Sequence, residues 1–329
     1  MNMFKPILGA LTSAVLLSSV ATAQETVTIS NIGHGYFSGP LYVAMREGLF
    51  EKHGLEADVT FVQGGSLAYQ TVFTREADFG LLSHEHVLTG AAQGRDLVSV
   101  FNITHRPLNN IVANNEMLEA HADKSLEERV LALKGKRVGT PSAGGSGEKM
   151  LTVLARRYGL EVPGDLELVY LGGDPSAYVG AFHGDVIDAA MPFEPAGVLL
   201  QQEGLGGTLV NIMDGEIEDF RDLIFIALVT HPDMLEERPE FVEKVVAVFA
   251  DAMEILLDPE RGEAIMAEEF ETMTPESNAL AYETVSQIWS PDGRMSLEGA
   301  KKVYEYLQPE GEHEIDFEST FTNDFLPEN

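Results

Sequence analysis

Short stretches of alternating apolar and polar residues recur along the chain, and most are followed by a glycine-rich turn and by apolar residues at helical spacing. Residues 27–32 alternate in this way, which predicts a strand. A glycine-rich turn at residues 33–40 follows, and Pro40 and Gly48 mark the start and the end of the next apolar segment. This first unit is therefore expected to be a strand, a turn and a helix.

The same order of elements is expected several more times. Further units cover residues 57–73, 78–94 and 97–103 and then, after a helix at 125–134, residues 137–158, 166–176 and 187–195. Residues 223–230 predict a strand that returns to the first group, and helices are expected at 239–257, 260–270, 275–288 and 296–307. Strands that alternate with helices imply mostly parallel sheets flanked by helices, so the fold class is α/β.

Length and charge narrow the organisation and the partners. A chain of 329 residues exceeds what one core usually fills, which favours two lobes. The sequence carries 21 basic and 53 acidic residues, a formal net charge of −32. Because nucleic acids are bound through clusters of lysine and arginine, this balance argues against a nucleic-acid partner.

Residues 1–23 have the order of a signal peptide. Lys5 precedes an apolar run at 7–20, and Ala-Thr-Ala at 21–23 forms a cleavage site, so export with cleavage after Ala23 is expected. No later stretch is long enough to span a membrane. The chain has no cysteine, which excludes disulfides, thiolate metal sites and a lipidated cysteine anchor. The mature chain is therefore expected to be free in a periplasm.

Three patterns that suggest cofactor or metal chemistry are incomplete. The turn at 33–38 begins as a dinucleotide-binding loop but has Ser38 where the last glycine belongs, and the turn at 139–146 lacks the lysine of a phosphate-binding loop. His84, Glu85 and His86 stand side by side without the spacing of metal ligands on a helix. No cofactor and no metal site are expected.

Polar residues at the predicted strand ends are better candidates for ligand contacts. His84 and Glu85 begin a helix, and His105 follows a strand in the same way. The predicted helix starts at Ser66 and Ser146, like the one at Ser83, offer free backbone N–H groups that can bind an anion without a basic side chain.

Several segments, in order, resemble one known family. The chain reads FSGPLYVA at 37–44, EGLF at 47–50 and HGL at 53–55, and similar signatures stand at 77–80, 133–139 and 184–190. These residues resemble the nitrate/sulfonate/taurine/thiamine-precursor group of ABC-importer substrate-binding proteins. The resemblance covers nearly the whole mature chain.

The resemblance implies the type II periplasmic binding protein fold, in which two α/β lobes hold a ligand between them and close around it. Lobe 1 is then expected to comprise residues 24–115 and 222–329, and lobe 2 residues 116–221. The ligand-binding residues implied by the resemblance are Gly35, Tyr36, Phe37, Gly65, Ser66, Ser83, His84, Glu85, Thr104, His105, Ser142, Gly144, Gly145, Ser146, Tyr178 and Glu194.

The implied function is that of a monomeric periplasmic protein that delivers a small organic solute to the membrane permease of an ABC importer, without catalysis. A sulfonate or taurine-like solute suits the serine and glycine turns, whereas Glu85 and Glu194 would suit an amine or an aminopyrimidine. The aspartate and tryptophan typical of pyrimidine-precursor binders are missing from residues 30–33, so a pyrimidine or thiamine precursor or an aromatic acid remains the alternative.

Two other functions stay open from the sequence. One is an exported enzyme that uses His84, Glu85 and Glu194 as acids and bases, although the related fungal pyrimidine synthases carry a cysteine-rich segment that this chain lacks. The other is a ligand-sensing domain that docks on a membrane receptor.

Overall fold

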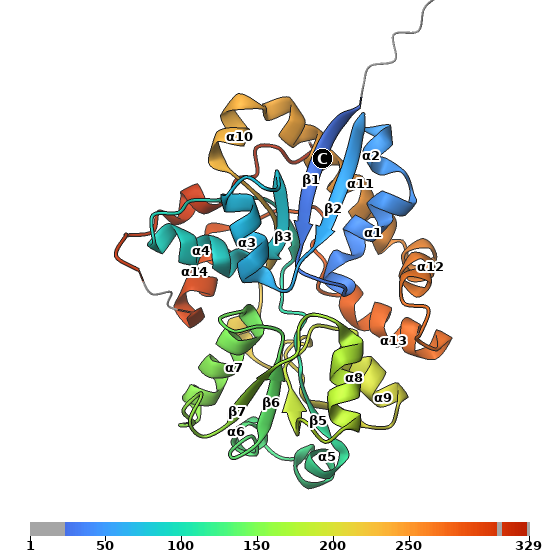
Figure 1. The fold of residues 1–329 in the computed structure, drawn as a ribbon, viewed down its shortest axis with the longest axis vertical. Coiled ribbons are helices and arrows are strands. Elements are labelled where there is room, and N and C mark those ends of the chain that lie inside the picture. The colour runs from blue at the N-terminus through green and yellow to red at the C-terminus, as the bar shows by residue number, and fades with distance from the viewer. Residues whose placement is uncertain (1–23, 308–310, 328–329) are drawn as a thin grey trace, which may run out of the picture.

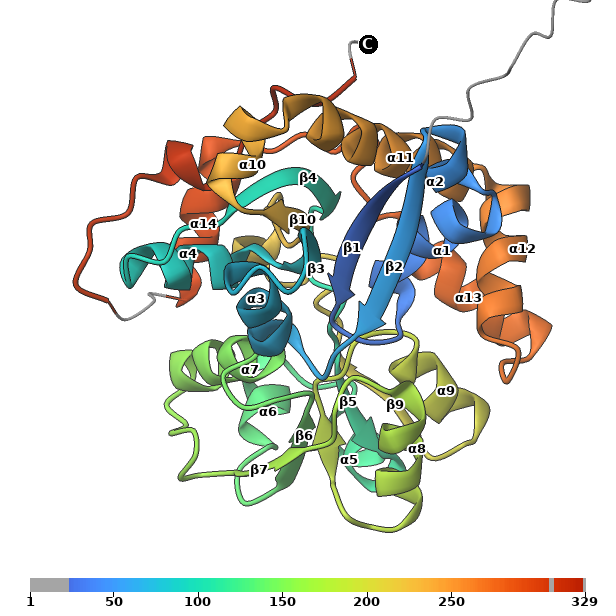
Figure 2. The same ribbon diagram turned by 45° about the horizontal axis from the view of Figure 1, so that its top comes forward.

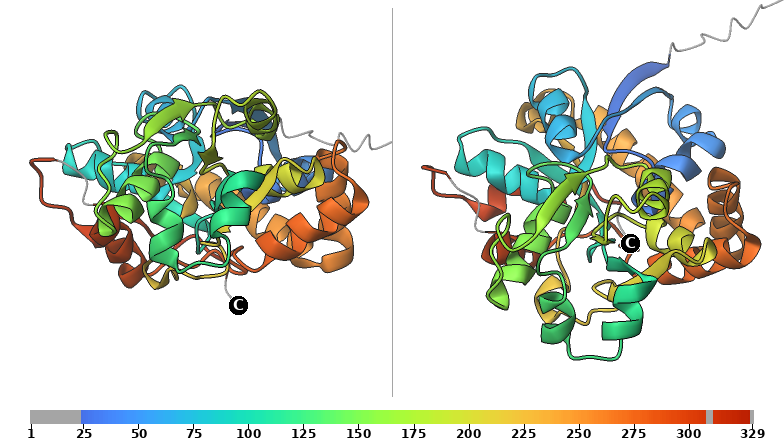
Figure 3. Two further views of the ribbon diagram at one scale, coloured as in Figure 1. Left: turned by 90° about the horizontal axis from the view of Figure 1, so that it is seen from below. Right: turned by 60° about the horizontal axis from the view of Figure 1, so that its bottom comes forward.

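Two separate five-stranded sheets organise the chain. The structure is a computed structural model and describes residues 24–307 and 311–327, so the predicted signal peptide lies outside the described residues. Each sheet with its helices forms a lobe, and lobe 1 lies above lobe 2 along the long axis of the molecule (Figure 1). Seen from below, the helices of lobe 2 lie in front of lobe 1 (Figure 3).

The sheet of lobe 1 has the strand order β2-β1-β3-β10-β4. Its strands are β1 (Glu25–Asn31), β2 (Leu55–Phe61), β3 (Phe79–Ser83), β4 (Val98–Thr104) and β10 (Ile226–Thr230). Strand β1 pairs in parallel with β2 and β3, whereas β10 is antiparallel to both β3 and β4. The predicted return of the chain at residues 223–230 is therefore confirmed, and β10 lies between two strands of the first sheet.

The sheet of lobe 2 repeats this arrangement with the order β7-β6-β8-β5-β9. Its strands are β5 (Ile111–Asn114), β6 (Arg137–Thr140), β7 (Glu167–Tyr170), β8 (Ala189–Ala190) and β9 (Gly206–Val210). Strand β6 is parallel to β7 and β8, and β5 is antiparallel to β8 and β9. In both lobes, the strand that follows a crossing of the chain enters the sheet as its antiparallel member.

Helices flank both sheets, as the α/β prediction requires. Lobe 1 carries α1 (Gly39–Arg46), α2 (Leu49–Lys52), α3 (Gly65–Phe73), α4 (His84–Ala92), α10 (Pro232–Glu237), α11 (Pro239–Leu257), α12 (Pro259–Glu269), α13 (Pro275–Ser286) and α14 (Leu297–Leu307). Lobe 2 carries α5 (Asn115–His121), α6 (Leu126–Leu131), α7 (Ser146–Arg157), α8 (Pro175–His183) and α9 (Ala196–Gln202). The long α11 crosses the top of lobe 1 and packs on α1 and α2 (Figure 2).

Local sequence signals explain several helix ends. Ser125 and Glu128 form the expected capping box at the start of α6, and Asp174 caps α8 ahead of Pro175. Gly48 takes a left-handed conformation with φ of 63°, but α1 already ends at Arg46 and Gly48 precedes the short α2.

One expected boundary moves. Strand β5 falls within the residues assigned to lobe 1 by the boundary at residue 115, yet it pairs with β8 and β9 of lobe 2. The first crossing therefore precedes Ile111, and the backbone bridge between Asn109 and Phe193 lies just beside it. The other lobe boundaries stay predictions from the sequence.

The central position of β10 gives a stability test. Leu228 is fully buried between β3 and β4, so Leu228→Ala should destabilise the fold by about 3 kcal/mol, because it removes buried methyl groups and leaves a cavity. The matched control is Leu280→Ala on α13, where the side chain is 43% exposed and a change below about 0.5 kcal/mol is expected. Urea unfolding measures both, and equal effects would contradict the placement of β10.

Candidate ligand-binding site

The turns that follow the strands of lobe 1 meet the turns that follow the strands of lobe 2. A Cβ atom at Gly33 would lie 3.7 Å from the Cα atom of Gly173, and one at Gly64 would lie 2.8 Å from the hydroxyl oxygen of Ser142. A Cβ atom at Gly172 would likewise lie 2.8 Å from the side-chain oxygen of Gln63. The glycines let the two backbones approach at the carboxyl ends of the strands, where open α/β sheets bind ligands.

The first contact between the lobes is a set of polar side chains, Ser83, Glu85, His86, Ser146 and Lys149, which we call the interlobe polar cluster. The hydroxyl oxygens of Ser83 and Ser146 lie 2.6 Å apart. Ser146 also donates to Oε1 of Glu85 at 3.4 Å, and Lys149 donates to Oε2 of the same carboxylate. The cluster joins the N-terminus of α4 in lobe 1 to the N-terminus of α7 in lobe 2.

Burial and geometry mark Glu85 as the centre of this cluster. Its side chain is 1% exposed, whereas that of Lys149 is 28% exposed. Nε2 of His86 lies 3.1 Å from Oε1 of Glu85 but has no hydrogen-bond partner of suitable geometry. Burial lowers the pKa of His86, an effect that the nearby Glu85 carboxylate opposes and the Lys149 ammonium reinforces.

A second contact between the lobes is aromatic and carries a buried carboxyl group. The backbone N–H of Tyr36 donates to the carbonyl oxygen of Glu194 at 3.2 Å, and the rings of Phe37 and Phe193 pack with centroids 5.0 Å apart. Tyr36 and Phe37 come from the turn after β1, and the other two residues from the turn after β8. This contact therefore places the apolar rings of Phe37 and Phe193 next to the acidic residue Glu194.

The side chain of Glu194 is held by the start of α9. Its Oε2 accepts from the backbone N–H groups of Gly197 at 3.1 Å and Val198 at 3.3 Å. Burial nevertheless raises the pKa of Glu194 to about 7, although these two hydrogen bonds act in the opposite direction. Among the described residues, no basic side chain forms an ion pair with it.

Two of the expected aromatic contacts have side chains that pack inside a lobe. The ring of Tyr36 stacks on Phe270 with centroids 5.0 Å apart, and Tyr178 donates from its hydroxyl group to the carbonyl oxygen of Gly172 at 3.0 Å. Burial raises the pKa of both tyrosines well above its usual range. Tyr36 contacts lobe 2 through its backbone N–H, whereas Tyr178 contributes to the core of lobe 2.

Three other residues of the expected set, His84, Thr104 and His105, lie inside lobe 1 or at its edge. Nδ1 of His84 lies 2.9 Å from the hydroxyl oxygen of Ser99, and burial lowers the pKa of His84 to about 3. The hydroxyl oxygen of Thr104 accepts from the backbone N–H of Ile226, and half-buried His105 lies beside the second crossing. The structure does not bring these side chains to the interlobe polar cluster or to the aromatic contact, so their roles stay predictions.

The small residues of the expected set contribute no charge, and two of them leave room for neighbouring rings. Gly35 leaves room for the ring of Phe37, and Gly65 for that of His86, because a Cβ atom would lie 2.4 Å and 2.2 Å from the respective ring atoms. Gly145 is the N-cap of α7. The remaining two members of the expected set, Ser66 and Gly144, are exposed.

The sequence prediction missed Lys149 and His86, the two basic residues of the interlobe polar cluster. A signal for Lys149 was present, because a residue three positions after Ser146 lies on the same side of the first helical turn. For His86, its place at a helix start did not show which way its side chain points. No group of three or more acidic, histidine or cysteine side chains in the described residues could hold a metal ion.

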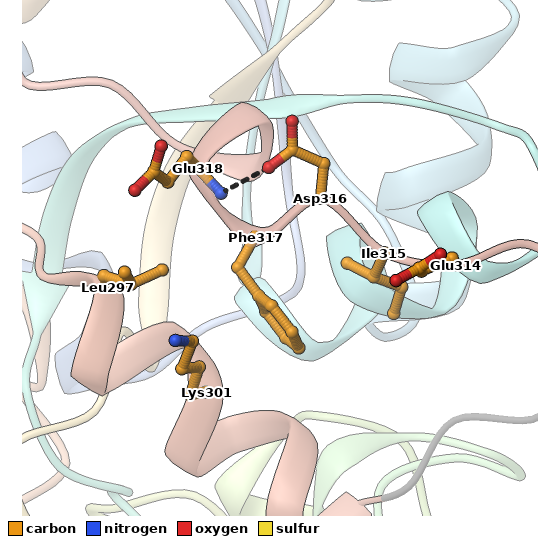
Figure 4. A pocket seen from close by; sticks show the side chains of 7 residues that line it. All are labelled: Leu297, Lys301, Glu314, Ile315, Asp316, Phe317 and Glu318. Carbon is orange, nitrogen blue, oxygen red and sulfur yellow. Dashed lines mark hydrogen bonds between the residues drawn. The ribbon is translucent and has the colours of Figure 1, made fainter.

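A groove on the outside of lobe 1 is a separate feature (Figure 4). It is lined by Leu297, Lys301, Glu314, Ile315, Asp316, Phe317 and Glu318. These residues belong to α14 and to the C-terminal segment, neither of which carries any of the expected ligand contacts. The groove therefore lies outside the candidate site.

Comparison with known proteins links this geometry to one family. The family model described as "NMT1/THI5 like" matches residues 37–261. A Brucella abortus (strain 2308) chain named "Putative binding protein" is 27% identical over 244 residues, which are 72% of this chain and 69% of that one. A chain of Uromyces fabae named 4-amino-5-hydroxymethyl-2-methylpyrimidine phosphate synthase is 24% identical over 87% of this chain and 83% of its own.

Solved structures share the fold. A protein from Bordetella bronchiseptica RB50 superposes with a TM-score of 0.81 at 20% identity, covering 92% of this chain and 96% of that one. The alkanesulfonate-binding protein SsuA from Xanthomonas axonopodis pv. citri, bound to MOPS, has a TM-score of 0.71 at 18% identity and covers 92% of this chain and 100% of that one. The expected periplasmic binding protein fold is confirmed. None of the helices in the described part of the chain has the length and apolarity of a membrane span.

The raised pKa of Glu194 predicts a pH dependence of stability. Since the folded pKa is about 7 against 4.5 in the unfolded chain, this group's contribution is full below about pH 4.5 and is lost as the pH rises through about 7. The loss corresponds to about 3 kcal/mol. Glu194→Gln should remove this component, so its unfolding free energy should fall less between pH 4.5 and 8 than that of the unchanged protein.

The control for this experiment is Glu203→Gln, an exposed glutamate just past the end of α9. Chemical unfolding at several pH values compares the three proteins. If the curve of Glu194→Gln ran parallel to the other two, the burial of an uncompensated carboxyl group at this position would be disproved.

Proposed function

We propose, from the premise that this chain belongs to the NMT1/THI5-like family, that it is the periplasmic solute-binding component of an ABC importer. It captures a small organic solute between its lobes and delivers it to the membrane permease. The observation that carries the proposal is that polar and aromatic groups of both lobes meet where the strands of both sheets end.

The connections between the lobes support a closing motion. Within residues 24–307 and 311–327, the chain crosses between the lobes twice, once between β4 and β5 and once between β9 and β10. Closure about such crossings brings the interlobe polar cluster together and encloses what lies between the lobes. A closed form that differs from the open one also gives a permease a shape to recognise, and a monomer is sufficient for this role.

The charges at the contact favour a nitrogen-bearing solute. Glu194 is buried without a cation and sits beside Phe37 and Phe193, so an amine or aminopyrimidine could donate to its carboxylate while its carbon skeleton packs on the rings. A sulfonate end alone would meet two buried carboxyl groups, Glu85 and Glu194. This chemistry moves the preference from a plain sulfonate to an amine-bearing solute, with taurine-like zwitterions and pyrimidine precursors within that class.

Catalysis is not part of the proposal. The synthase name of the Uromyces fabae relative is the observation that favours an enzyme, but His84 lies against Ser99 and not at the contact between the lobes. Without His84, the acid-base set expected for an enzyme is incomplete. Recovery of the bound solute unchanged after long incubation separates a binding protein from an enzyme.

Binding by the proposed site predicts thermal stabilisation by small amines. A solute at a hundred times its Kd should raise the unfolding free energy by about 2.7 kcal/mol, because it binds only the folded state. Glu194→Gln should weaken the binding of such a solute about tenfold or more, since it removes a charged hydrogen-bond acceptor. Thermal unfolding against a panel of amines, aminopyrimidines, zwitterions and sulfonates measures the effect.

Glu203→Gln, outside the site, should keep the full response to the same panel. A flat response of the unchanged protein to every nitrogen-bearing solute would contradict the proposed solute class. Equal responses of the unchanged protein and Glu194→Gln would remove Glu194 from the site.

A further inference from the structure

The carboxylate of Glu85 occupies a position that is built for an anion. It lies in lobe 1 but reaches the N-terminus of α7 in lobe 2, a helix of 12 residues. Free backbone N–H groups and a partial positive charge stabilise negative groups at such an end. Here the chain itself supplies the negative group.

The donors around Glu85 come from both lobes. Ser146 donates to Oε1, Lys149 donates to Oε2, and Ser83 lies within hydrogen-bond distance of Ser146. If Ser146 gives its proton to Glu85, then Ser83 is the donor in the pair of hydroxyl groups. The result is a chain of donors that ends on the carboxylate.

His86 is an additional donor that Glu85 does not use. Its side chain is 7% exposed, and Nε2 lies 3.1 Å from Oε1 of Glu85 but at an angle that forms no hydrogen bond with it. Gly65 makes this approach possible, because a Cβ atom there would lie 2.2 Å from Nε2. A buried polar nitrogen without a partner is costly, so its position indicates a site with room for another acceptor.

We propose that Glu85 is a specificity-determining residue whose carboxylate fills an anion-binding position formed by Ser83, His86, Ser146 and Lys149, and thereby excludes free anions from the ligand site. This inference rests on the proposed function, since it assigns part of the same contact between the lobes. Solutes enter through their nitrogen groups near Glu194, while the anion position is already taken. A simple sulfonate would have to displace a buried, paired carboxylate, which costs far more than an exposed ion pair.

The test is to empty the position and offer an anion. Glu85→Ser removes the carboxylate and leaves space, whereas Glu85→Gln removes the charge but keeps the volume. Isothermal titration calorimetry with sodium methanesulfonate should show binding by Glu85→Ser at least tenfold tighter than by the unchanged protein or by Glu85→Gln. Tris chloride is the buffer, because sulfonate buffers would compete.

A second substitution identifies the donors. In Glu85→Ser, the further change Lys149→Met should abolish the gained affinity, because it removes the cation that pairs with Glu85. Circular dichroism establishes that each variant is folded. The proposal is overturned if folded Glu85→Ser gains no affinity for methanesulfonate, or if the gain survives the loss of Lys149.

The unchanged protein separates this inference from the proposed function. If it binds amines and Glu85→Ser gains nothing, the anion position is disproved and the proposed function stands. If it binds no amine but Glu85→Ser gains methanesulfonate, the anion position stands and the proposed solute class falls. Tight binding of methanesulfonate by the unchanged protein would overturn the exclusion role of Glu85.

Discussion

The structure depends on how charge is compensated where the two lobes meet. Glu85 is almost fully buried there and is compensated by Lys149 from the opposite lobe, whereas Glu194 is buried with only backbone N–H groups as partners. Burying a carboxylate costs free energy unless it has a partner, so Lys149 compensates Glu85, and we propose that a cationic or hydrogen-bond-donating ligand completes Glu194. Both depend on glycine turns that let the backbones approach at the strand ends.

Much of the fold could be predicted from the sequence because its signals are local. Alternating apolar and polar residues in strands, proline at helix starts and the capping box of Ser125 and Glu128 identify most elements. The apolar segment before Thr230 was also expected to return to lobe 1. The strand that was not expected is β9, which begins with two glycines and carries no clear alternation of apolar and polar residues. Strand β5 has only four residues, Ile111–Asn114, and the expected boundary at residue 115 placed it in the wrong lobe.

The candidate site was harder to predict because it depends on side-chain direction. Adjacent residues on a helix point in different directions, so the sequence His84-Glu85-His86 could not show that the first histidine faces Ser99 and the second faces Glu85. The rotation of α4 is set by packing across the whole lobe. The pairing of Glu85 with Lys149 spans two lobes, and no local pattern encodes it.

The central claim is that this chain binds one small nitrogen-bearing solute between its lobes. Native mass spectrometry of the protein, purified from its own cells with no ligand added, tests this claim most directly. The account predicts a single solute bound in a one-to-one complex, released on denaturation and identified as an organic molecule with an amino or protonated nitrogen. An inorganic anion or a plain sulfonate released in its place would contradict the account.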